Sequence, residues 1–178
     1  GHQYDHRRGE DPELISEGLG NSVYDGTPGI AHFLHSLYRL HTDDIIKKTA
    51  LGAIRHALYH ADLSTPQLLH SFWCGPLGVA MVALEMSETF GDQELHQAAL
   101  AMWETIINSP IVQDAGFDVL EGSAGAIISI LQHRSILPEP IPQTYLRAHA
   151  DHLLQRSAAT SHGRSWPSLQ DDQTALLG

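Results

Sequence analysis

The sequence predicts an all-α fold of the α/α toroid type, a double-layered helical barrel of which about three two-helix repeats are present. A G-x-x-G pair precedes an apolar segment three times, and the pairs open at Gly26, Gly75 and Gly122, so that they follow one another at 49 and 47 residues. A nearly constant period of this size is typical of a repeat architecture. Each apolar segment is also followed by an amphipathic one, and no strand pattern competes with the helical spacing. An open helical solenoid would have the same local pattern, but glycines at every inner-helix start favour a closed ring, whose backbones crowd at the centre.

The glycine pairs are the first candidate site. We expect the first glycine of each pair to allow a tight or left-handed turn into a helix, and the second to let another backbone approach closely. The N–H groups of the three helix starts carry partial positive charge and would face one cavity, where they could bind an anion or a polar ligand. The alternative is that the glycines only permit close helix packing. The cavity-lining candidates are Gly26, Gly29, Gly75, Gly78, Gly122 and Gly125.

The order of the elements follows from the apolar spacing. Residues 1–12 are polar and charged and are expected to be a flexible arm or a cloning remnant, and residues 13–178 to be the toroid domain. Thr42 is the expected N-cap of the second helix. The sequence predicts inner helices over residues 30–40, 79–89 and 126–131, outer helices over 45–58, 95–107 and 143–159, and a loop over 161–167.

Composition limits the classes of function. The 178 residues carry a formal net charge of −11, which argues against nucleic acid as a partner, because phosphates are bound by Lys and Arg. A single cysteine excludes an internal disulfide and suits a reducing compartment. No segment has the ~20 apolar residues of a membrane span, and the first residues lack the apolar core of a signal peptide. We therefore expect a cytoplasmic protein.

Three stretches carry a resemblance to a known family. They are Leu19–Ala31, Asp118–Ala126, and the spacing of Gly75-Pro76-Leu77-Gly78. Over about residues 13–178 the chain resembles lanthionine synthetase C-like proteins, the cyclases of lanthipeptide (lantibiotic) biosynthesis. It is most similar to the C-terminal cyclase domain of class II lanthipeptide synthetases.

The resemblance implies a peptide-modifying reaction at a central zinc. The zinc would bind a cysteine of the precursor peptide as thiolate, which adds to dehydroalanine or dehydrobutyrine and closes a thioether ring. A metal lowers the thiol pKa, and an acid–base group must protonate the carbon of the enolate that forms. Asp118 matches the family's active-site aspartate in a D-x-x-x-G motif and is the candidate catalytic residue. Without the resemblance, Asp118 would simply be a carboxylate favoured by the dipole at a helix start.

The zinc ligands that the resemblance implies, a cysteine and a cysteine–histidine pair, belong to later repeats. Cys74 lies in the second repeat and lacks one residue of the family's W-C-x-G spacing, so we expect a partly buried core cysteine. His32 and His35 have an i, i+3 spacing that is common by chance, and His56 and His60 belong to an outer helix. We therefore expect no metal in this chain alone and no activity without the remaining repeats. Its expected partners are the precursor peptide and those repeats or a second copy.

Two other functions remain open. One is a zinc-free helical-repeat module that binds a peptide or a protein. The other is a carbohydrate-acting α/α-barrel enzyme that uses a carboxylate pair such as Asp25 and Asp118, although aromatic residues are only 7% of the chain.

Overall fold

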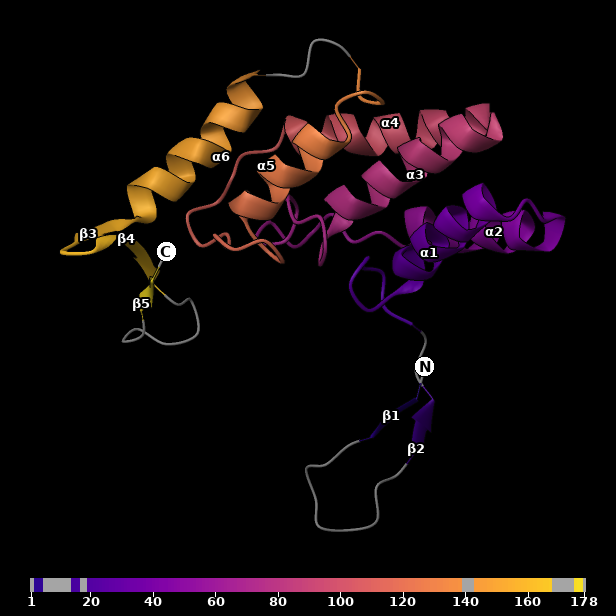
Figure 1. The fold of residues 1–178 in the computed structure, drawn as a ribbon, viewed down its shortest axis with the longest axis horizontal. Helices are drawn as coiled ribbons and strands as arrows, with labels where there is room; N and C mark the ends of the chain where they lie inside the picture. Colours follow the sequence, from indigo (N-terminus) through magenta and orange to yellow (C-terminus); the bar gives the residue numbers. More distant parts are fainter. Residues whose placement is uncertain (1, 5–13, 17–18, 139–142, 168–174, 178) are drawn as a thin grey trace.

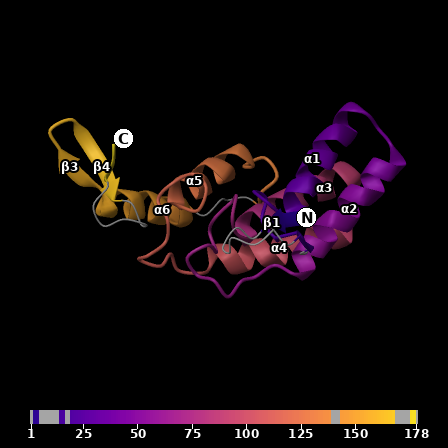
Figure 2. The same ribbon diagram turned by 90° about the horizontal axis from the view of Figure 1, so that it is seen from below.

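The computed structural model describes residues 2–4, 14–16, 19–138, 143–167 and 175–177. In this part of the chain, six α-helices form three consecutive helical hairpins, which follow one another in an arc (Figures 1 and 2). The prediction of an all-α helical-repeat fold is confirmed. The helices are α1 (Thr27–Leu40), α2 (Asp44–Tyr59), α3 (Pro76–Phe90), α4 (Gln93–Ile107), α5 (Ser123–Gln132) and α6 (Gln143–Arg156).

Short polar signals set the helix ends. Asp43, and not the predicted Thr42, caps α2, because its Oδ1 accepts hydrogen bonds from the N–H groups of Ile45 at 2.7 Å and Ile46 at 3.1 Å. Gly91 ends α3 in the left-handed conformation, with φ of 65°. Asp92 follows at once and caps α4. The α3–α4 connection is therefore only two residues long, which forces the two helices to pack as an antiparallel pair.

The core is centred on α3. Eleven of its fifteen residues are buried, from Pro76 through Leu84 and then Met86 and Ser87. This explains its nearly continuous apolar sequence, because α3 has neighbours on every side. In α1, by contrast, Phe33 is 64% and Ile30 41% exposed. The apolar face of α1 that the sequence predicts is thus only partly covered.

The C-terminal part of the described chain contains strands that the sequence analysis missed. β3 (Ala158–Thr160), β4 (Gly163–Pro167) and β5 (Ala175–Leu177) form an antiparallel sheet in the order β3-β4-β5. The predicted loop over 161–167 is therefore wrong from Gly163 on, where β4 begins, and only residues 161–162 are a turn. Gly163, at φ of 133°, makes the tight turn possible, and α6 ends at Arg156, three residues earlier than predicted.

A second small sheet pairs β1 (His2–Tyr4) with β2 (Leu14–Ser16) in antiparallel register. The predicted boundary between residues 12 and 13 lies outside the described residues. None of the helices in the described part of the chain combines the length and the apolar character that a membrane span requires.

Candidate functional site

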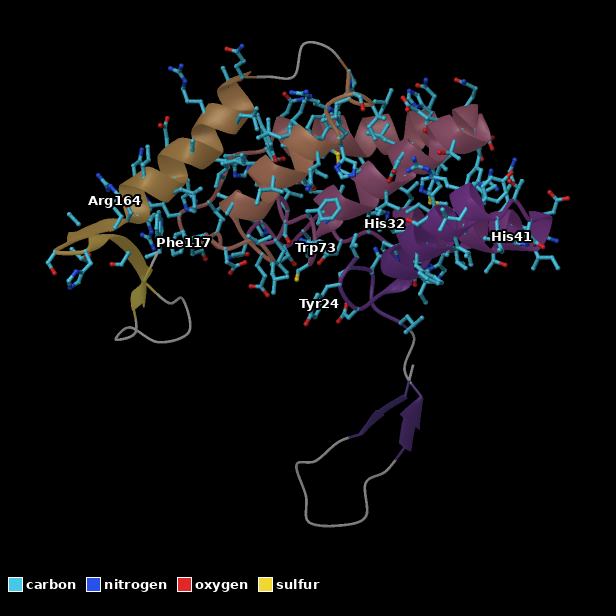
Figure 3. All side chains as sticks on the ribbon, in the orientation of Figure 1. Tyr24, His32, His41, Trp73, Phe117 and Arg164 are labelled. Carbon is cyan, nitrogen blue, oxygen red and sulfur yellow. The ribbon has the colours of Figure 1, made fainter. Side chains whose placement is uncertain are left out.

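The loops that lead into α1, α3 and α5 lie side by side. The N–H group of Tyr24 donates to the carbonyl of Trp73 at 2.9 Å and joins the first loop to the second. The Ser71 hydroxyl donates to the carbonyl of Leu120 at 2.6 Å and joins the second loop to the third. We call these three loops, residues 20–26, 68–75 and 116–122, the rim. In Figure 3, Tyr24, Trp73 and Phe117 mark the rim along one edge of the arc. The expectation that the three helix starts come together therefore agrees with the contacts between their loops.

The glycine pairs exist for close backbone contact. A Cβ atom at Gly29 would overlap the carbonyl of Val23, and one at Gly125 would overlap that of Val119, in each case six residues earlier in the same rim loop. The other four candidates are crowded in the same way: Gly26 by Gly20, Gly75 by Leu68, Gly78 by Phe72, and Gly122 by Gly116. The approaching backbone is thus each helix's own lead-in loop.

A tight or left-handed turn was expected at the first glycine of each pair, and the left-handed alternative is wrong. Gly26, Gly75 and Gly122 have φ of −124°, −133° and −120°, which is extended backbone. Their small size, and not their φ range, is what the fold requires.

The N–H groups at the starts of α1 and α5 are already used. The N–H of Thr27 donates to the Gly20 carbonyl at 2.9 Å, and that of Gly125 to the Asp118 carbonyl at 3.2 Å. Ser123 and Ala124 likewise donate to carbonyls of their own loop. An anion would have to replace these bonds, so the idea of anion binding by these two helix starts fails. That the six glycines line a cavity stays a prediction.

Asp118 lies exposed on the rim, directly before α5. Its Oδ1 accepts hydrogen bonds from the N–H groups of Leu120 at 2.6 Å and Glu121 at 2.8 Å. Both hydrogen bonds that the described residues give to this carboxylate go to Oδ1. The side chain is therefore fixed in direction by its own turn, as Asp side chains commonly are before a helix.

Two more carboxylates share the rim with Asp118. Burial raises the pKa of the Cys74 thiol, and the negative charges of Glu121, Asp25 and Asp118 raise it further. These carboxylates come from the loops before α1 and α5, and their charges reach a thiol from the loop before α3. The Ser22 hydroxyl donates to Asp25 Oδ1 at 2.6 Å and holds it in place. The sequence analysis named Asp25 only for a carbohydrate-acting enzyme and missed Glu121, although Glu121 directly precedes a predicted helix start.

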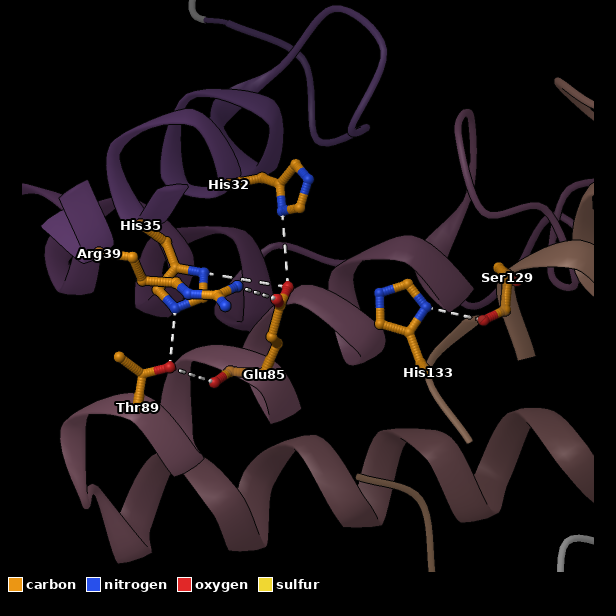
Figure 4. A network of polar contacts seen from close by, with 7 residues as sticks. All are labelled: His32, His35, Arg39, Glu85, Thr89, Ser129 and His133. Carbon is orange, nitrogen blue, oxygen red and sulfur yellow. Dashed lines mark hydrogen bonds and ion pairs between the residues drawn. The ribbon is translucent and has the colours of Figure 1, made fainter. Parts of the chain in front are cut away.

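The metal donors of the described chain lie elsewhere. Among the residues that the structure describes, one group of three His, Cys, Asp or Glu side chains could share an ion, and it consists of His32 and His35 of α1 and Glu85 of α3. Figure 4 shows both imidazoles directed at the Glu85 carboxylate. Burial lowers the pKa of His35, while the Glu85 carboxylate opposes that shift. Neither Cys74 nor Asp118 belongs to this group.

The described residues do not fit the zinc centre that the resemblance implies. That centre needs two cysteines and a histidine, and a cysteine binds zinc as thiolate. Cys74 is the chain's one cysteine, and the acidic surroundings of the rim disfavour its thiolate. This chain therefore lacks the donor set of that centre.

A cluster of polar side chains also joins α5 to α6. The hydroxyl of Ser123 lies 2.9 Å from His149 Nδ1 and 3.0 Å from His152 Nδ1. His149 is 1% exposed, and its ring stands edge-on to that of His70. Burial, with repulsion from His70 and His152, lowers the pKa of His149 to about 3. The ring is therefore neutral at physiological pH and supports packing rather than proton transfer.

Comparison with known proteins agrees with this architecture. Residues 17–178 match the family described as lanthionine synthetase C-like protein. A search of curated proteins found no match to the chain. The family match covers both the glycine-rich rim and all six helices, and we conclude that the chain belongs to the lanthionine synthetase C-like family.

Proposed function

We propose that this chain is part of a thioether-forming cyclase, as in class II lanthipeptide synthetases, and that the rim forms part of its substrate-binding wall. The proposal rests on the family and, above all, on one observation: hydrogen bonds join three successive helix-start loops, and Asp118, Asp25 and Glu121 share the rim that they form. A simple helical packing role does not require three carboxylates from two separate loops on one rim.

In the proposed reaction, a cysteine thiolate of the precursor peptide adds to the β-carbon of a dehydroalanine or dehydrobutyrine. The electron pair of the double bond moves to the α-carbon, which then takes up a proton, so that a C–S bond and a C–H bond form. Asp118 acts in this proton movement or orients the group that performs it, because its carboxylate is held by two N–H donors and exposed to the rim. Zinc supplies thiol activation in the family's complete domain, and this chain by itself is proposed not to cyclise peptides.

The negative charge of the rim should also affect which peptides bind. With three carboxylates on one edge, a peptide that carries Lys or Arg near its cysteines is attracted, whereas an acidic peptide is repelled. Tyr24, which is 66% exposed, and the partly exposed Trp73 add flat surfaces for contact with such a peptide. A reducing, cytoplasmic location belongs to the same proposal, because the reaction needs free thiols.

The test is a cyclisation assay with Asp118→Asn in the protein that carries this chain. A dehydrated peptide with one cysteine is incubated with enzyme, and the remaining free thiol is alkylated and counted by mass spectrometry, since ring closure does not change the peptide mass. Loss of an acid–base group should lower the rate about 10²- to 10⁴-fold. Asp151→Asn, an exposed aspartate on α6, is the matched control and should leave the rate unchanged. Equal rates for Asp118→Asn and the control would refute the role of Asp118.

The alternative is a zinc-free helical-repeat module that only binds a peptide or protein. The exposed aromatic and acidic residues of the rim would suit peptide binding even in a protein that does not form thioether rings. Peptide binding, measured by fluorescence anisotropy, separates the two: a module binds a labelled peptide and never consumes its thiol, in the wild type as in Asp118→Asn.

Exposed apolar side chains on α1 and α5 indicate where partners could bind. Ile30 and Phe33 of α1, and Ile128 and Leu131 of α5, are each between 41% and 64% exposed. Large exposed apolar side chains of neighbouring turns are typical of association surfaces. We propose that further cyclase repeats, or a second copy of the chain, cover them.

A further inference from the structure

The side chains of His32, His35 and Glu85 meet at the contact of α1 with α3. His32 Nδ1 lies 3.8 Å and His35 Nδ1 3.9 Å from Glu85 Oε2. These distances are too long for hydrogen bonds. All three atoms are shielded from solvent, and none has a hydrogen-bond partner in the described chain. Three unpartnered polar atoms at one point are an energetic cost that a native structure normally avoids.

The proton position on His35 follows from its neighbour. The Thr89 hydroxyl donates its single proton to the carbonyl of Glu85 at 3.1 Å. Its oxygen therefore accepts from His35 Nε2, 2.8 Å away. This assigns the N–H to Nε2 and leaves a lone pair on Nδ1 of the neutral ring. That lone pair is directed at a carboxylate oxygen (Figure 4), an arrangement that is repulsive unless a cation lies between them.

The spacing suits a metal ion. Ligands at 2.0–2.1 Å from a tetrahedral zinc are about 3.3 Å apart. The three donor atoms lie within 4.8 Å of one another, so that small side-chain rotations would bring them into position. In metal-binding histidines, the ring nitrogen that does not bind the metal usually donates a hydrogen bond to an outer partner, which fixes the ring. The hydrogen bond from His35 Nε2 to Thr89 is of this kind. His32 is 37% and Glu85 24% exposed, which leaves a route for the ion and for a water as fourth ligand.

We propose that His32, His35 and Glu85 form a binding site for one Zn²⁺ ion, with nitrogen and oxygen ligands only, at the contact of the first and second helical hairpins. The ion would join α1 to α3. The site is independent of the rim, because it shares no residue with it. Arg39 Nη1 lies 3.5 Å from Glu85 Oε1. This leaves Oε2 for the ion but places a competing positive charge beside it.

The experiment uses the full chain, stripped with a chelator and then titrated with Zn²⁺ against a chromophoric indicator. We expect one high-affinity Zn²⁺ per chain, and a rise in melting temperature that depends on zinc concentration. X-ray absorption at the zinc edge should show nitrogen and oxygen neighbours at about 2.0–2.1 Å. A sulfur neighbour would assign the ion to Cys74 and overturn the proposal, as would the absence of binding at micromolar zinc.

The variants separate a built site from surface chelation. Glu85→Gln keeps the side-chain size and should lower the zinc affinity more than a hundredfold, while Thr89→Val, which removes only the outer partner of His35, should lower it about 10- to 100-fold. Arg39→Gln should raise it about two- to fivefold, because the competing exposed charge is gone.

The matched control removes the exposed pair His56 and His60, whose ring centroids are 4.4 Å apart. This double change to Ala should leave the stoichiometry and the affinity unchanged. If it removes the ion, or if Glu85→Gln retains full affinity, the proposed site does not exist. Circular dichroism of each variant confirms that a lost ion is not a lost fold.

Discussion

Acidification should destabilise this fold through the buried imidazole of His149. The pKa of His149 is lowered to about 3 in the folded chain, against 6.5 in an unfolded one. Because the unfolded state takes up the proton first, the free energy of unfolding is highest above pH 6.5 and falls as the pH drops from 6.5 toward 3. His70 and His152, which face the ring and repel its charge, act in the same direction.

The magnitude follows from the two pKa values. Between them the slope approaches about 1.4 kcal/mol per pH unit for one group, and at pH 5 His149 alone should cost about 2 kcal/mol relative to pH 7.5. This is a substantial part of the 5–15 kcal/mol by which domains are usually stable.

Urea unfolding at half-unit steps from pH 5 to 7.5, followed by circular dichroism, measures the effect. In His149→Gln the slope should fall by about one proton, whereas His162→Gln, which removes an exposed ring that water surrounds in both states, should leave it unchanged. A free energy of unfolding that stays constant over this range, or a slope that is the same in both variants, would refute the reasoning.

Two further predictions concern stability. Gly125→Ala should destabilise the fold by about 1–3 kcal/mol, because the new methyl group meets the backbone of its own rim loop. Gly52→Ala should stabilise the fold by about 0.5–1 kcal/mol, because Gly52 lies in the middle of α2 with open space beside it. Thermal unfolding of both variants measures the two effects. Asp92→Ala should cost about 1–2 kcal/mol, because it removes the cap of α4 and the 2.6 Å ion pair with Arg55 of α2, whereas Asp92→Asn should lose less than 1 kcal/mol since an amide oxygen can still cap. Urea unfolding in low and in high salt separates these contributions: a salt-independent difference between Asp92→Asn and the wild type would show that the ion pair contributes nothing.

The helices were predictable because their signals are local. The period of the glycine pairs, the apolar run of α3 and the end of α3 at Gly91 each lie within a few residues of what they specify. The strands β3 and β4 were not predicted, because each is short and their pairing depends on one turn at Gly163. The indole N–H of Trp166, which donates to the carbonyl of Leu153 at 2.8 Å, ties β4 to α6 and could not be foreseen from spacing.

The rim was predictable in part. The three helix starts and Asp118 follow from sequence, but the grouping of Asp25 and Glu121 with Asp118 near Cys74 depends on how the loops pack. The proposed zinc site was even less predictable, because Glu85 lies fifty residues after His35 and only the packing of α3 on α1 brings the two side chains together. One signal was available: Glu85 is the first charged residue of α3 and directly follows its apolar run, and a carboxylate at such a position needs a partner.

Because the family is associated with zinc, zinc bound by this chain would be an ambiguous result unless its ligands are known. Stoichiometric metal could be mistaken for evidence of a catalytic centre, although burial and the charges of nearby carboxylates oppose the ionisation of the chain's one thiol, that of Cys74. Cys74→Ser should therefore leave zinc stoichiometry unchanged, and a Co²⁺-substituted chain should lack a sulfur-to-cobalt charge-transfer band in both forms. If Cys74→Ser instead removes the ion, the rim itself is the metal site, and the imidazoles of α1 need another explanation. An ion that is retained in Cys74→Ser and lost in Glu85→Gln is a feature of the α1–α3 contact, and cyclase activity then has to be judged from Asp118 and the rim alone.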